Sequence, residues 1–235
     1  MTAARLVAVL LGGVAAYLGS NLTALGADGT DGPPSFEWVW QIIRPVTQVK
    51  TASGKMPPLR PAARRLYNQR IAALRAGNAA SYDHTYLCKP MGEPRTGYEG
   101  QPFDIVQNER VIFIGYTWNR MVRFVYLADQ HPELTGPAFY GSWIGRWDGS
   151  TLVFDGIGFN ADTLLDRAGM PHSEDLHLVQ RLRLREGGKQ LEIRTHIEDA
   201  KTFTAAWDTV HTYKRLPGAL IQEDICPQRL KLTIY

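Results

Sequence analysis

The sequence has none of the short motifs that mark nucleotide or metal chemistry. No GxxxxGK[ST] phosphate loop, HExxH zinc motif or GxSxG nucleophile elbow occurs, no GxGxxG follows a predicted strand, and no Cys/His spacing is typical of zinc. A large excess of one charge is also missing, since 26 Lys and Arg oppose 23 Asp and Glu and the net charge is only +3. Nucleic-acid binding needs a concentrated basic surface, which this total does not indicate. The sequence therefore predicts no nucleic-acid partner and no nucleotide, metal or other cofactor.

Global disorder and a multi-span membrane protein are excluded by composition. Hydrophobic residues make up 44% of the chain and charged residues 21%, which is ordinary for a globular protein. A chain of 235 residues is long enough for one domain with appendages.

The N-terminus has the features of an export segment. Arg5 is the only charged residue before Asp28, and residues 6–18 are strongly apolar. One interpretation is a secretory signal peptide cleaved before Ala27. The other, which we favour, is a retained anchor in which residues 6–26 cross the lipid bilayer as a helix of about 31 Å. The anchored protein would lie at the periplasmic side of the cytoplasmic membrane, and the cleaved protein would be soluble in the periplasm or secreted.

Cys88 and Cys226 are the two cysteines of the chain. In an oxidising compartment such a pair most simply forms one disulfide, which would tie the end of the chain to the beginning of its β-rich domain. Closing so long a loop stabilises a protein by on the order of 4 kcal/mol in the chain-entropy model. The alternative is a pair of buried free thiols.

Residues 27–80 are predicted to form an extended arm followed by one helix. Six prolines between positions 33 and 61 interrupt the arm too often for long helices or central strands. The helix is predicted over residues 62–77, where apolar side chains recur near helical spacing and Gly77 ends the pattern.

An aromatic cluster lies within this arm. Trp is a preferred anchor in protein interfaces and also collects at the lipid headgroup level. We therefore expect four side chains to contact a partner protein or the membrane: Phe36, Trp38, Trp40 and Ile43. The alternative is that they cover one end of the protein's own core.

From residue 103 the apolar period becomes two, which is typical of strands. Eight strands are predicted, over residues 105–114, 121–127, 142–147, 151–155, 176–185, 190–198, 209–214 and 220–226. Turn dipeptides join several of them as hairpins. The sequence therefore predicts a mainly β domain over residues 81–235, an antiparallel meander forming a barrel or sandwich with a lipocalin-like or other calycin-like topology.

The hairpin around Gly187-Gly188 can be assigned a register. If these residues form the turn, one side of the hairpin is apolar and pairs Gln180 with Thr195 in its middle. The other side pairs His177 with Glu198. A slip of one residue would exchange the two sides, so the register is strongly set.

The densest polar stretch, residues 166–177, provides the candidate site. If the protein is an enzyme, two imidazoles would perform acid–base catalysis, a carboxylate would orient one of them and an arginine would hold an anion. These residues are His172, His177, Glu198, Asp199 and Arg167. A divalent metal could use the same set, although its spacing matches no known metal motif. The competing interpretation is structural, with Asp166 paired to Arg167 and His177 to Glu198.

Residues 145–160, 165–173 and 197–207 resemble a family of exported bacterial proteins of unknown function. Its usual pattern reads G-R-W-E-G-D-T-L-V-V-D-T-x-G-F-N, then L-D-R-x-G-x-P-H-S, L-H-x-x-E-R-F-R-R and I-E-D-P-x-x-F-T-x-P-W. The resemblance covers about residues 100–226 and implies an exported β-rich architecture, with little about chemistry. Gln180 stands where the family tends to carry Glu, so a reaction that uses this carboxyl as an acid or base would be lost here.

Three functions are compatible with these features, and we lean towards one without catalysis. The first is an accessory or binding protein that docks on a membrane protein complex through its anchor and Trp-rich arm. The second is a cofactor-independent periplasmic isomerase, lyase or hydrolase for a small or lipophilic substrate. The third is a lipophilic-ligand carrier whose cavity wall includes the apolar side of the 177–198 hairpin.

Overall fold

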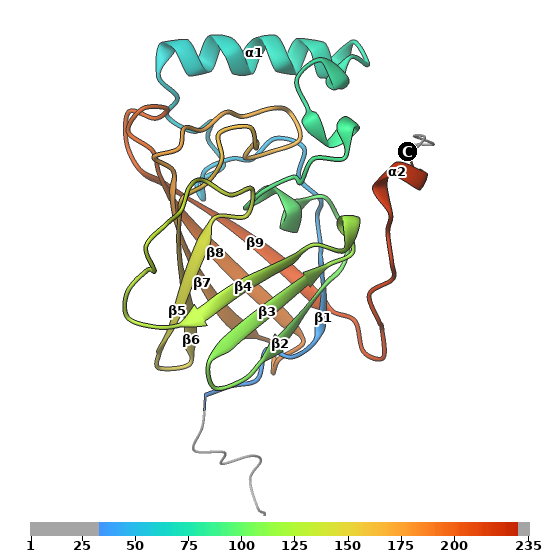
Figure 1. The fold of residues 1–235 in the computed structure, drawn as a ribbon, viewed down its shortest axis with the longest axis vertical. Coiled ribbons are helices and arrows are strands. Elements are labelled where there is room, and N and C mark those ends of the chain that lie inside the picture. Colours follow the sequence, from blue (N-terminus) through green and yellow to red (C-terminus); the bar gives the residue numbers. More distant parts are fainter. Residues whose placement is uncertain (1–32, 230–235) are drawn as a thin grey trace, which may run out of the picture. The chain divides into compact units, whose positions relative to one another are not determined.

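The structure, a computed structural model, describes residues 33–229, and nine strands close into a barrel (Figure 1). The strands are β1 (Val39–Ile42), β2 (Phe103–Gln107), β3 (Val111–Tyr116), β4 (Val122–Leu127), β5 (Ser142–Asp148), β6 (Thr151–Ile157), β7 (His177–Arg185), β8 (Gln190–Glu198) and β9 (Trp207–Arg215). The helices are α1 (Pro61–Arg75) and the short α2 (Cys226–Arg229), with 3₁₀ turns η1 (Ala79–Ser81), η2 (His84–Leu87), η3 (Arg95–Tyr98) and η4 (Trp118–Arg120). The mainly β barrel with one long helix is thus confirmed.

The barrel is mostly antiparallel, but one pair corrects the predicted meander. β4 and β5 are parallel, with Val125 opposite Trp143, because residues 128–141 return the chain to the same end of the barrel. This loop crosses the outside of the barrel, where His131 Nε2 lies 3.0 Å from Asp155 Oδ1. Every other neighbouring pair is antiparallel, including the β1–β9 pair that closes the barrel.

The closing strand β1 comes from the segment for which the sequence predicts an extended arm. Trp40 pairs with Phe103 of β2 and with Arg215 of β9, so this part of the arm belongs to the barrel wall. Trp40 and Ile42 alternate into the core and are buried. The many prolines flank β1 but do not enter it, which leaves its backbone free to pair on both sides.

Two other predicted strands differ from the structure. Residues 105–114 form the β2–β3 hairpin rather than one strand, because the Asn108 side chain accepts hydrogen bonds from the N–H groups of Arg110 and Val111 and turns the chain without glycine. Residues 220–226 form no strand; they run past the β3–β4 turn and lead into α2.

The predicted hairpin register and disulfide are confirmed. Gln180 faces Thr195 and His177 faces Glu198 across β7 and β8. Cys88 and Cys226 form a disulfide with their Cα atoms 5.6 Å apart, although Cys226 begins α2 instead of belonging to a last strand. The predicted signal or anchor, residues 1–26, lies outside the described residues. Within residues 33–229 no helix has both the length and the apolar character needed to cross a membrane.

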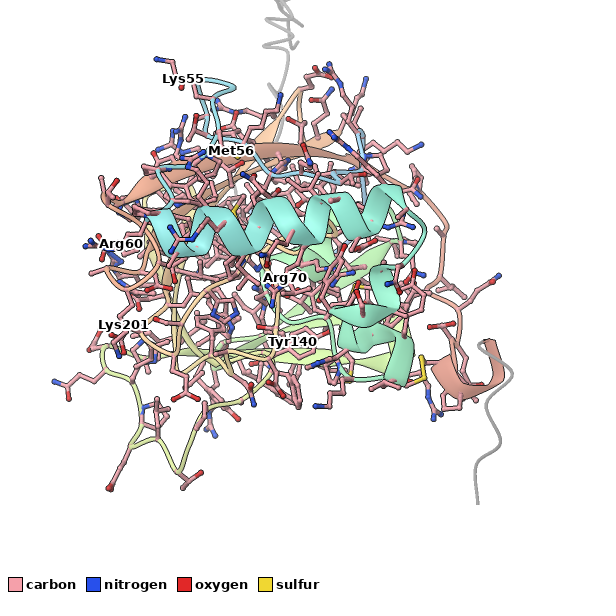
Figure 2. All side chains as sticks on the ribbon, turned by 90° about the horizontal axis from the view of Figure 1, so that it is seen from above. Lys55, Met56, Arg60, Arg70, Tyr140 and Lys201 are labelled. Carbon is pink, nitrogen blue, oxygen red and sulfur yellow. A yellow bond between two sulfur atoms is a disulfide. The ribbon has the colours of Figure 1, made fainter. Side chains whose placement is uncertain are left out.

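Helix α1 lies across one end of the barrel, as Figure 2 shows from above, with Arg60 and Lys201 close to its first turn. The Arg60 Nε–H donates to the carbonyl of Ala200 at 2.7 Å. One residue of the helix is fully buried, Tyr67, and its hydroxyl donates to Asp166 Oδ2 at 2.6 Å.

Asp166 organises the contact between α1 and the loop beneath it. Its carboxylate also accepts from the backbone N–H groups of Val49 at 2.9 Å and Met170 at 3.0 Å. Burial raises the pKa of Asp166, while these hydrogen bonds and the one from Tyr67 oppose the rise. Asp166, which the sequence suggested as a partner of Arg167, thus holds three separate segments together.

Replacing Tyr67 by Phe is expected to lower the free energy of unfolding by about 1–3 kcal/mol, because a buried carboxylate oxygen loses a donor. Urea denaturation followed by circular dichroism measures the change. Tyr86→Phe, at an exposed ring, is the matched control and is expected to be neutral. Equal stability of Tyr67→Phe and the parent would contradict the role given to this hydrogen bond.

Candidate functional site

The barrel interior is built around a buried ion pair. Arg123 of β4 places Nη1 3.2 Å from Glu93 Oε2, and both side chains are at most 3% exposed. The same nitrogen donates to Gln180 Oε1 at 2.9 Å, and the Tyr116 hydroxyl donates to Glu93 Oε1 at 2.5 Å. Four elements or loops therefore meet at one charge pair in the middle of the barrel.

Aromatic rings complete the surroundings of Arg123. Its guanidinium lies 4.5 Å from the centre of the Trp143 ring and 5.4 Å from that of Phe154. A cation over a ring face is attracted by the ring quadrupole, most strongly where water is excluded. Burial raises the pKa of Glu93, while Arg123 and the Tyr116 hydroxyl favour its charged form.

Little space remains in the interior. A cavity of about 20 Å³ lies between Glu93, Tyr98, Tyr116, Arg123 and Gln180 among others. One water needs at least about 10–15 Å³, whereas ligand pockets commonly measure about 300–1,000 Å³. This interior cavity is therefore too small for a ligand of ordinary size.

Gln180 lies in the barrel interior beside Arg123. It is buried, and its side chain oxygen accepts from Arg123. A carboxylate at this position would be a second acid facing the same guanidinium. The amide instead accepts from Arg123 Nη1 and does not titrate, so Gln180 provides no acid–base group in the centre of the barrel.

Two of the five predicted catalytic residues, His172 and Asp199, hold loops in place through hydrogen bonds. The Nδ1–H of His172 donates to the Ser173 carbonyl at 2.8 Å, and Nε2 lies 2.7 Å from the Thr163 hydroxyl. Burial lowers the pKa of His172, which keeps the ring neutral. Asp199 accepts from the Ser173 N–H at 2.6 Å and from the backbone N–H of Thr202 at 3.1 Å.

The outer face of the barrel holds a row of alternating imidazoles and carboxylates. His177 lies 3.0 Å from Asp155 through Nε2 and 3.3 Å from Glu198 through Nδ1. His196 lies 3.0 Å from Glu198 through Nε2 and 2.6 Å from Asp208 through Nδ1. The predicted surface pair of His177 and Glu198 is thus part of a longer row across β6, β7, β8 and β9.

Hydrogen bonds shift the pKa values of two side chains in this row, His196 and Glu198. Partial burial lowers the pKa of His196, but its bonds to Asp208 and Glu198 outweigh that effect, so the pKa is raised overall. The bonds from His196 and His177 lower the pKa of Glu198. A ring with carboxylates at both nitrogens is satisfied only when both nitrogens carry protons.

The fifth predicted residue, Arg167, lies apart from all of these. Its side chain is exposed and lines a pocket of about 210 Å³ together with Arg95, Glu99 and Trp118. Within the predicted set, His177 and Glu198 are the pair that lies within hydrogen-bond distance, and His172 and Asp199 are linked through Ser173. Among the described residues, no group of three or more His, Cys, Asp or Glu side chains has the geometry to hold a metal ion.

The four predicted contact residues of the arm divide into two pairs. Phe36 and Trp40 are fully buried, and the Trp40 Nε1–H donates to the Phe36 carbonyl at 3.0 Å, so they serve the core and not a partner. Trp38 and Ile43 are 40% and 43% exposed. The Arg215 guanidinium lies 4.1 Å from the centre of the Trp38 ring.

An apolar surface that the sequence analysis missed covers three adjacent strands. We call it the β2–β4 face, and it consists of Val106, Phe113, Val122, Phe124 and Tyr126. Phe113 and Phe124 are paired across the strands with ring centres 5.3 Å apart and nearly perpendicular planes. The sequence of β4 carries a signal for this face. Arg123 points inward while Phe124 and Tyr126 point outward, whereas the usual pattern places apolar residues inside and charged residues in solvent.

No protein-family model matches the sequence, and no curated protein matches it significantly.

Replacing Arg123 by Met is expected to cost about 3–5 kcal/mol of stability, because Glu93 loses its buried counter-ion. The loss should be smaller at acidic pH, where Glu93 is protonated. The double variant Arg123→Met/Glu93→Gln is expected to recover a large part of the loss, since no unpaired charge remains. Denaturation curves over a pH series test this; additive effects of the two substitutions would contradict the pairing.

His196 is expected to stabilise the fold only on the acid side. Its folded pKa lies above the unfolded value, so the contribution is complete below the unfolded pKa of about 6.5 and is lost as pH rises through the folded pKa. His196→Gln should therefore lose at most about 1 kcal/mol relative to the parent at acidic pH, because the ring is partly exposed. The deficit should vanish at alkaline pH, and an equal deficit at both ends would refute it.

Proposed function

We propose that this protein is a non-catalytic accessory protein that docks on a membrane protein complex at the periplasmic face of the cytoplasmic membrane. The observation that carries the proposal is the β2–β4 face. Tyr126 is 53% exposed, and Val106, Phe124 and Val122 are each more than 40% exposed on the same side of the barrel. Such contiguous apolar surface on a soluble body typically marks an interaction site.

A protein partner fits this face better than a lipid surface does. The rim of the face carries charges of both signs, with Asp104 and Glu109 opposed by Arg110 and Arg146. An anionic membrane would favour a uniformly basic rim, whereas an apolar centre rich in aromatic rings with a mixed polar rim is the anatomy of a protein interface. Trp38 and Ile43 remain in the proposal as exposed contacts of the arm, while Phe36 and Trp40 do not.

The side chains of the barrel interior support the non-catalytic part of this proposal. The barrel centre holds a paired arginine and glutamate and the non-titrating Gln180, while His172 and Asp199 are engaged in hydrogen bonds with backbone groups of the surrounding loops. We propose in addition that the closed barrel has a lipocalin-like or other calycin-like topology, with the outer wall rather than the lumen as the working surface.

The test compares membranes from cells that produce the parent, Phe124→Glu or Leu87→Glu at native levels. Leu87 is 69% exposed and lies outside the β2–β4 face, so Leu87→Glu is the matched control. After gentle detergent extraction, the parent and Leu87→Glu are expected to retain the same membrane subunits in fixed stoichiometry, whereas Phe124→Glu should lose them. Hydrogen exchange of the purified complex should show protection within β2, β3 and β4.

Circular dichroism and thermal melting establish that Phe124→Glu is folded before the comparison. Retention of the complex by folded Phe124→Glu, or a parent protein that is always monomeric and alone, would refute the docking function.

A further inference from the structure

Away from the β2–β4 face, the structure forms a second surface feature with its own chemistry. The segment between η1 and β2, the side chain of Trp118 and the loop of Arg167 surround an open pocket of about 210 Å³. From the groups described below, we propose that this pocket binds a small zwitterion of the α-amino acid type with an apolar or aromatic side chain.

The floor of the pocket is a pre-organised ion pair. Arg95 donates from Nη1 and Nη2 to the two oxygens of Asp83 at 3.0 and 2.7 Å, and from Nε to Glu99 Oε1 at 2.7 Å. Both Arg95 and Asp83 are 3% exposed. A guanidinium has five N–H groups, so these bonds leave one N–H on each terminal nitrogen for a ligand.

Acceptors for a ligand ammonium group lie beside this pair. Gln101 Oε1 is buried and has no hydrogen-bond partner among the described residues. A buried acceptor without a donor costs free energy, and a ligand N–H would remove that cost. The Glu99 carboxylate also lines the pocket and, after accepting from Arg95, retains further acceptor sites.

Arg167 is positioned to bind the anionic group of such a ligand. Its exposed guanidinium lines the pocket and has no hydrogen bond or ion pair with other described side chains. The planar fork of arginine matches a carboxylate through two parallel bonds. The charged lining groups are balanced, two arginines against Asp83 and Glu99, so neither a pure anion nor a pure cation matches the pocket as well as a ligand with both charges.

The remaining wall suits an apolar ligand body. Met91 and Trp118 are buried in the wall, and Tyr86, whose ring is 44% exposed, stands beside them. Aromatic and thioether side chains pack well on a ring or branched aliphatic group. Cys226 packs against Met91 and Trp118, so the disulfide to Cys88 supports this wall from behind.

The test titrates the purified, oxidised protein with three probes that share one phenylethyl skeleton: L-phenylalanine, phenethylamine, which lacks the carboxylate, and 3-phenylpropionate, which lacks the ammonium group. Calorimetry gives affinities, and NMR follows the indole N–H of Trp118 and the side-chain amide of Gln101. We expect phenylalanine to bind tightest, with shifts confined to the pocket. Binding of the two singly charged probes as tightly as phenylalanine, or no binding of any probe at millimolar concentration, would overturn the proposal.

Substitutions then assign the charges. Arg167→Ala should weaken phenylalanine binding by about tenfold or more and leave phenethylamine unchanged, because only the carboxylate contact is lost. Arg65→Ala removes an exposed arginine of α1 that does not line the pocket, and is expected to bind all probes like the parent. Unchanged phenylalanine affinity in Arg167→Ala would overturn the assignment. These variants leave the β2–β4 face intact, so this result is independent of the docking test.

Discussion

The buried contact between Arg123 and Glu93 is the constraint on which the rest of the molecule depends. Charges that leave water need a partner and hydrogen bonds, and here Gln180 accepts from Arg123 while Tyr116 donates to Glu93 from another part of the wall. Because this network fills the barrel, the lumen has no space for a sizeable ligand. The two surfaces on which our proposals rest, the β2–β4 face and the pocket near Arg167, both lie outside this packed interior.

The same network explains the arrangement of the loops above the barrel. Glu93 enters the interior from the long segment between α1 and β2, which fixes that segment from within. Two residues further on, Arg95 forms the ion pair at the pocket floor, and the disulfide at Cys88 holds the segment from the other side. The pocket is thus built from irregular backbone that is fixed at several points, which allows precise placement of side chains outside regular structure.

The sequence predicts those parts of the fold that depend on local pattern. The β7–β8 register follows from strict alternation around Gly187-Gly188, and α1 follows from helical spacing. What it does not reveal depends on distant partners: β1 becomes a strand only because β2 and β9 flank it, and Glu93 becomes an interior residue only because Arg123 faces it. Likewise, the five-residue candidate site does not form because His172 and Asp199 form hydrogen bonds with backbone groups of the loops around them.

The pairing of β1 with β9 has a consequence for how the chain matures. The first strand and the last are neighbours, so the wall cannot close until residues 207–215 are available to bridge β8 and β1. Until that moment two strand edges remain unpaired and open to other chains. A protein that emerges from a ribosome or a translocation channel N-terminus first must therefore leave one edge of β1 unpaired until residues 207–215 have emerged. This topology therefore requires that the unpaired edge of β1 be protected, either by a chaperone or by rapid folding.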